Sequence, residues 1–143
     1  MFKNIFKKQK KESLDNRNVL VAALLIHAAK IDENYTNIEK EIIKKALVNL
    51  YDLNSVQAEE LIKNAEKKEE ESNQIIEFTG EIKKYPIVSR LKIIEVIWTI
   101  VYSDGTSDSY ESNLIRRICG LLYVSDKDNG IIKTKVHNLK NKK

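Results

Sequence analysis

Residues 104–111 read Asp-Gly-Thr-Ser-Asp-Ser-Tyr-Glu and lie between two apolar stretches with helical spacing. Gly105 can adopt the left-handed backbone conformation that ends a helix. Asp108 and Glu111 have the spacing of a capping box, in which the first side chain accepts from a backbone amide and the second reaches back. The stretch therefore predicts a helix, an acidic turn and a second, capped helix.

Two roles are open for the acids of this turn. Capping alone explains Asp108 and Glu111. Asp104 differs, because it follows the C-terminal end of a helix, where the macrodipole is negative and a carboxylate is unfavourable. A cation or a donor from another segment would offset that charge, whereas a solvated Asp at a turn would need neither.

An altered copy of the pattern occurs 72 residues earlier in the chain. The paired positions are Asp32 with Asp104, Thr36 with Asp108, Glu39 with Glu111, and Tyr51 with Tyr123. Thr36 and Glu39 again have capping-box spacing. The repetition predicts an internal two-fold duplication, each half consisting of a helix, an acidic turn and a capped helix.

The second copy, Ser103-Asp104-Gly105-x-x-Asp108-x-x-Glu111, resembles the TerB (tellurite-resistance) family, and the chain is closest to the small TerB-like proteins. The likeness covers roughly residues 19–136. The family pattern in each half is Ala-Asp-Gly-x-x-Asp-x-x-Glu. The second copy differs from it at Ser103, while the first copy has Glu33 in place of Gly and Thr36 in place of Asp.

This resemblance implies an all-helical, duplicated domain whose clustered acids bind a divalent metal. The matching residues are Asp32, Glu39, Asp104, Asp108 and Glu111. Their carboxylates are hard ligands suited to calcium, manganese or magnesium. Related domains are coupled to stress response and to membrane co-chaperones, and no enzymatic activity comes with the resemblance.

The fold class predicted from periodicity is all-α, in a single domain of about seven helices. The chain has 143 residues, four Gly and one Pro, and its long apolar runs have helical spacing. We expect the helical domain over residues 13–140, with the two most apolar helices packed at its centre. The expected helices are 16–32, 37–51, 55–70, 73–84, 86–103, 109–122 and 126–139. Asn54 and Gln57 have capping-box spacing at the start of the third, and Ser72 is expected to open the fourth. The charge run at 66–71 is expected to be a solvated face, and Trp98 is expected to be part of the core.

Charge divides the chain into basic ends and an acidic body. Five lysines lie in residues 1–11 and five more in residues 133–143; without these ten, 15 basic residues face 21 acidic ones. An acidic body argues against nucleic-acid binding. Residues 1–12 form a basic segment with Phe2, Ile5 and Phe6 at helical spacing. Three interpretations are open: a helix on an anionic membrane surface, a disordered tail, or a helix whose Phe side chains pack on the core.

No constellation of catalytic residues is recognisable. The only cysteine, Cys119, lies on an apolar helical stretch and is expected to be a buried, inert thiol, typical of a reducing cytoplasm. His27 is expected to be satisfied rather than a metal ligand, since no second His lies four residues away. Residues 104–111 are also too short for an EF-hand loop.

Two functions from different classes remain. One is a non-catalytic stress-response or interaction module that binds a divalent cation at its acidic turns. The other is a membrane-peripheral adaptor, held at the inner face of the membrane by its basic N-terminus, in which the acids only cap helices. The sequence does not name the protein partner.

Overall fold

The computed structural model describes residues 18–30, 37–72, 74–103 and 109–141, without the side chains of 109–112, 140 and 141. These described residues contain helices and connecting turns and no strand, so the all-α prediction is confirmed. The first helix covers residues 18–30. It is followed by α2 (Asn37–Tyr51), α3 (Ser55–Glu71), α4 (Ile76–Ile82), α5 (Ile87–Tyr102), α6 (Ser109–Leu121) and α7 (Asp126–Asn141).

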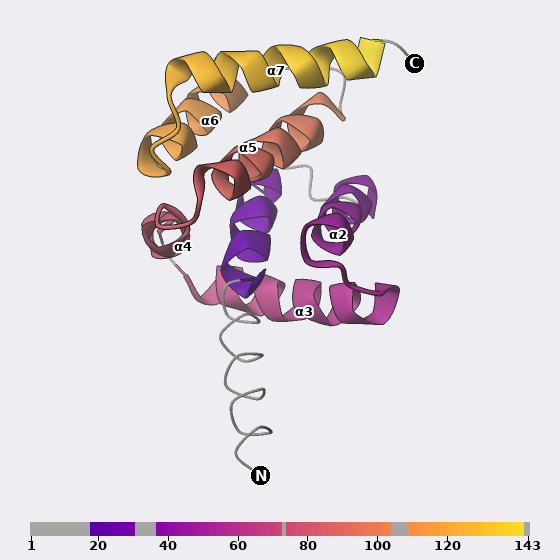
Figure 1. Ribbon diagram of the computed structural model, residues 1–143. Helices are drawn as coiled ribbons and strands as arrows, with labels where there is room; N and C mark the ends of the chain where they lie inside the picture. The colour runs from indigo at the N-terminus through magenta and orange to yellow at the C-terminus, as the bar shows by residue number, and fades with distance from the viewer. Residues whose placement is uncertain (1–17, 31–36, 73, 104–108, 142–143) are drawn as a thin grey trace.

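The helices are stacked in layers (Figure 1). The helix α7 lies along one outer edge next to α6, α5 runs beneath them, and α3 forms the opposite edge. Contacts between α5 and each of α2, α6 and α7 make α5 the helix that joins the two halves of the chain. The internal duplication itself stays a prediction.

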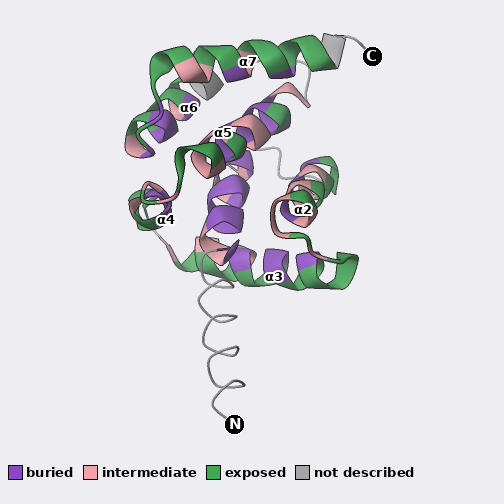
Figure 2. Cartoon of the chain, in the orientation of Figure 1, coloured by how far each residue is buried: buried purple, intermediate pink, exposed green. Residues whose placement is uncertain are grey.

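One hydrophobic cluster fills the interior, and both of the most apolar helices belong to it, as predicted (Figure 2). Every residue from Val21 to Ile26 is completely buried. This stretch of the 18–30 helix is apolar on all sides, as is typical of a helix that is surrounded by other elements. From α5 the cluster takes Ile93, Ile94, Ile97, Trp98, Ile100 and Val101.

Most helix ends follow their local sequence signals. Asn54 and Gln57 form the predicted capping box at the start of α3, each side chain accepting from the other residue's backbone amide. Ser72 was predicted to open the fourth helix, and that prediction is wrong. Its hydroxyl donates to Lys68 O at 2.8 Å and its amide to Glu69 O, so Ser72 ends α3 and α4 begins only at Ile76.

The turn between α6 and α7 is held by Arg90, a contact the sequence did not indicate. Tyr123 has a φ of 56°, in the left-handed region that favours glycine. Arg90 Nη1 donates to Leu122 O at 2.9 Å and to Tyr123 O at 3.2 Å, while Nε donates to Tyr85 O at 2.9 Å. One guanidinium thus fixes the carbonyls of two separate turns.

Candidate functional site

Glu39 is the one predicted metal ligand whose side chain the structure describes, and it is 2% exposed. It lies in the first turn of α2, where the helix macrodipole favours a carboxylate. Ser103 Oγ lies 3.4 Å from Glu39 Oε1. The hydroxyl proton has a closer acceptor, Ile100 O at 2.6 Å. A carboxylate oxygen of α2 and a hydroxyl oxygen at the end of α5 therefore lie side by side.

The other predicted ligands fall outside what is described. Asp32, Asp104 and Asp108 lie outside the described residues, and Glu111 is on α6 but its side chain is not among those described. Among the residues that are described, no group of three or more His, Cys, Asp or Glu could hold a metal ion. Convergence of the five acids stays a prediction.

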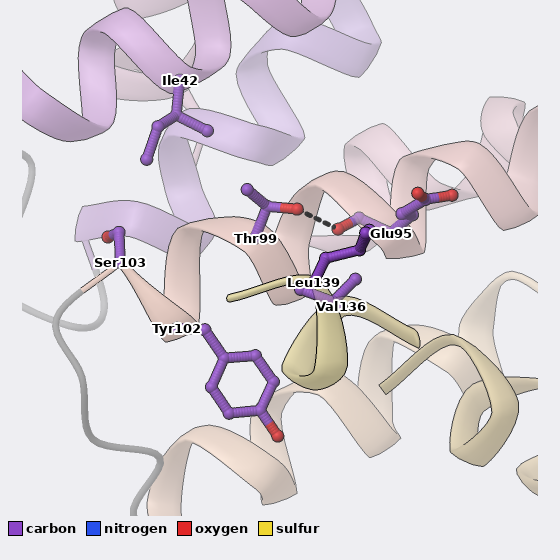
Figure 3. Close-up of a pocket in the computed structure, with 7 residues that line it drawn as sticks. All are labelled: Ile42, Glu95, Thr99, Tyr102, Ser103, Val136 and Leu139. Atoms are coloured by element: carbon purple, nitrogen blue, oxygen red, sulfur yellow. Dashed lines mark hydrogen bonds between the residues drawn. The ribbon is translucent and has the colours of Figure 1, made fainter. Parts of the chain in front are cut away.

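A pocket of about 290 Å³ opens beside Ser103, between α2, α5 and α7 (Figure 3). Its walls are mainly apolar, including Ile42 from α2 and Val136 and Leu139 from α7. Thr99 Oγ1 donates to Glu95 O at 2.9 Å, within α5. The Thr99 hydroxyl of this wall is therefore engaged in a hydrogen bond within its own helix.

The carboxylate of Glu95, which also lines the pocket, lies 3.2 Å from Lys135 Nζ. This ion pair joins α5 to α7. Its side chains are substantially exposed, so it contributes little to stability.

A second charged cluster joins residues 18–30 to α3. Glu69 Oε2 accepts from Lys30 Nζ at 2.7 Å, and Glu69 Oε1 lies 3.2 Å from His27 Nδ1. Burial alone would raise the pKa of Glu69, but the hydrogen bonds from Lys30 and His27 outweigh it, so the pKa lies below its ordinary value. His27 is therefore satisfied, as expected. The charge run at 66–71, predicted to be a solvated face, is in part a structural contact.

Cys119 and Trp98, which were both expected in the core, are buried. Burial raises the pKa of the Cys119 thiol to about 12, with a smaller contribution from Asp126, so the thiolate form is unfavourable at neutral pH. Trp98 is buried, and its Nε1 donates to Asn129 Oδ1 at 2.8 Å. Neither residue is placed to react with a ligand.

Within the described part of the chain, no helix has both the length and the apolar character to cross a membrane.

Comparison with known proteins gives one match. No curated protein and no solved structure matches the chain. The family described as tellurite resistance protein TerB matches residues 18–134, which is most of the chain and covers the first helix, α2 to α6 and the first part of α7. No catalytic family is indicated. The chain belongs to the TerB family.

Proposed function

We propose that this protein is a non-catalytic, cytoplasmic module of the stress response that engages a protein partner and binds a divalent cation at its acidic turns. Family membership supports the coarser part, a helical module associated with tellurite resistance. The bound cation, the protein partner and the cytoplasmic location go beyond what family membership supports, and they are proposals.

The contact between Glu39 and Ser103 carries the cation proposal. Glu39 ends the first acidic turn, and Ser103 directly precedes Asp104, the first acid of the second. Consecutive Cα atoms are about 3.8 Å apart, which limits how far Asp104 can be from Glu39. This contact supports the view that the two turns meet.

The donor set fits a hard cation. A carboxylate buried like that of Glu39 is costly unless its charge is compensated, and a divalent ion beside it would contribute compensation. Glu39, Asp104, Asp108, Glu111 and Asp32 would supply oxygen ligands of the kind that Ca²⁺, Mn²⁺ and Mg²⁺ prefer. Because Thr36 stands where the family has Asp, we expect weak affinity, with a Kd of about 10⁻⁴ to 10⁻³ M.

The non-catalytic part is supported by what the reactive side chains do. The thiol of Cys119 has a raised pKa and the imidazole of His27 contacts Glu69. These contacts are structural, and they do not activate a nucleophile.

Thermal unfolding with and without calcium or manganese, at constant ionic strength, tests the cation proposal. A ligand at about 100 times its Kd adds about 2.7 kcal/mol to stability, so wild type should melt higher with millimolar cation. Asp104→Asn should abolish that rise. Asp52→Asn, at the exposed end of α2, is the matched control and should keep it. Equal melting with and without cation, or an equal rise in Asp104→Asn, would leave the acids as helix caps.

A further inference from the structure

A continuous groove runs along α5, with α2 as its other wall. Its middle is a hollow of about 510 Å³, which shares Lys92 with a hollow of about 320 Å³ near the start of α5. The middle also shares Ile42 and Thr99 with the pocket beside Ser103, where Ile42 faces Thr99 (Figure 3). From Ser89 to Ser103 this α2–α5 groove spans fourteen residues, roughly 20 Å at 1.5 Å per residue.

The floor of the α2–α5 groove is apolar. Ile42, Ala46 and Leu50 lie one turn apart on α2 and are half-buried, as is Val96 on α5. At the end beside Ser103 the strip continues onto Leu139 of α7, which is 56% exposed. Covering apolar surface stabilises a protein by about 25 cal/mol per Å². Within the described part of the chain no element covers this strip, so it is available to another apolar segment.

The N-terminal part of the chain meets the described structure at this groove. Asn18, the first described residue, lines its near end together with Ser89. Phe6 is twelve residues before Asn18, a span of roughly 18 Å as a helix or up to about 40 Å when extended. Either conformation lets the residues around Phe6 reach the far end of the groove, beside Ser103.

The apolar residues of the segment match the floor of the groove. Phe2, Ile5 and Phe6 have helical spacing, so a helix formed there would present them on one edge. Aromatic side chains bury a large area each, which suits an open apolar strip.

Charge also matches along the length of the groove. Its near and middle parts carry the exposed Lys45 and Lys92, and the residues that follow the N-terminal lysines include Glu12 and Asp15. Its far end is acidic, because Ser103 lies next to Glu39 and is followed directly by Asp104. The lysine-rich start of the chain would lie there. Opposite charges therefore meet at both ends when the segment runs from Asn18 toward Ser103.

We propose that residues 1–12 of this chain dock in its own α2–α5 groove, with Phe2, Ile5 and Phe6 on the apolar floor and the lysines toward the acidic end. Docking withholds the same side chains from a membrane, so contact with an anionic membrane requires the segment to leave the groove. The docked arrangement does not depend on the proposed cation.

Paramagnetic broadening from a nitroxide attached through Asn4→Cys tests the docking in the full chain. Cys119 is buried, so the thiol-specific label should react only at the introduced cysteine. The amides of Ala46 and Val96 in the groove should broaden, whereas that of the exposed Lys67 on α3, outside the groove, should not. A labelled chain mixed with an unlabelled, ¹⁵N-enriched one should give no broadening, because the contact lies within one chain.

Two variants identify the contact. Phe2→Ser combined with Phe6→Ser should abolish the broadening in the groove, and so should Ala46→Arg, which places a bulky cation on the floor. Val56→Arg adds the same side chain at an exposed position on α3, outside the groove, and should retain the broadening. Phe2 and Phe6 lie outside the described core, so their variant tests docking even where Ala46→Arg lowers stability.

Three results would overturn the proposal. One is equal broadening of the groove amides and Lys67. Another is broadening that survives Phe2→Ser with Phe6→Ser, or that is the same in Ala46→Arg and Val56→Arg. The third is broadening that occurs only between chains, which would make the occupant of the groove a second copy of the protein.

Discussion

Replacing Arg90 by Met should destabilise the fold, because Arg90 holds two turns through backbone carbonyls. The variant keeps the length of the side chain and removes the donors to Tyr85 O, Leu122 O and Tyr123 O. Hydrogen bonds from charged groups contribute about 1.5–3 kcal/mol each. We count only the two bonds at 2.9 Å in estimating the loss of stability. The 3.2 Å bond to Tyr123 O comes from Nη1, which already donates to Leu122 O.

Arg90 is only half-buried, so water replaces part of what is lost. We therefore expect a loss of about 2 kcal/mol in the free energy of unfolding, which is below the lower limit of about 3 kcal/mol for two such bonds when fully buried. For a chain of this length that corresponds to a Tm lower by roughly 6–8 °C.

Urea unfolding monitored by Trp98, the only tryptophan and a buried one, measures this loss. Arg117→Met is the control, because Arg117 is exposed on α6 and should cost less than about 0.5 kcal/mol. If the two variants unfold at the same urea concentration with the same m value, Arg90 does not hold the turns as argued.

Two further predictions rest on local structure at Tyr123 and Glu69, and a third rests on the basic N-terminal segment. Tyr123→Gly should be more stable than Tyr123→Ala by about 1 kcal/mol, because only glycine adopts a φ of 56° without strain; equal stability in urea would contradict the strain. The pKa of Glu69 is lower in the folded chain than its ordinary value of 4.5, so its contribution is present above that pH and is lost as the pH falls through the folded pKa. Glu69→Gln should therefore flatten the acid side of the stability profile, and an unchanged slope would refute the contact with Lys30 and His27. Deleting residues 1–11 should abolish weak, salt-sensitive sedimentation with anionic liposomes, because five lysines each contribute on the order of 1 kcal/mol at such a surface; sedimentation that survives the deletion would exclude this segment as the anchor.

The sequence predicts the helices well because their signals are local. Apolar periodicity and the Asn54 capping box depend on neighbours along the chain, and α2 begins and ends where it was expected. Ser72 was misassigned because a serine is an acceptable residue at either end of a helix. Its hydroxyl bond to Lys68 O is decided only once α3 is formed.

The contacts around the site could not be predicted in the same way. The sequence identified Glu39 as an acid of the turn, but not its contact with Ser103, which is 64 residues away and depends on how α2 packs against α5. Glu69 lies in a charge run typical of solvated helices, so the sequence did not indicate its contacts with Lys30 and His27. Arg90 gave no signal, because its acceptors are backbone carbonyls, and these leave no pattern in the side chains.

Paramagnetic broadening by Mn²⁺ tests the central claim, a cation site at the acidic turns, most directly. A trace of Mn²⁺ added to the labelled full chain should broaden the amides of Glu39 and Ser103 before those of Ser89 and Lys92, at the other end of α5, and excess Ca²⁺ should reverse it. Asp104→Asn should lose this selectivity. Broadening that is uniform over the surface, or identical in Asp104→Asn and wild type, would contradict a cation site built from the two turns.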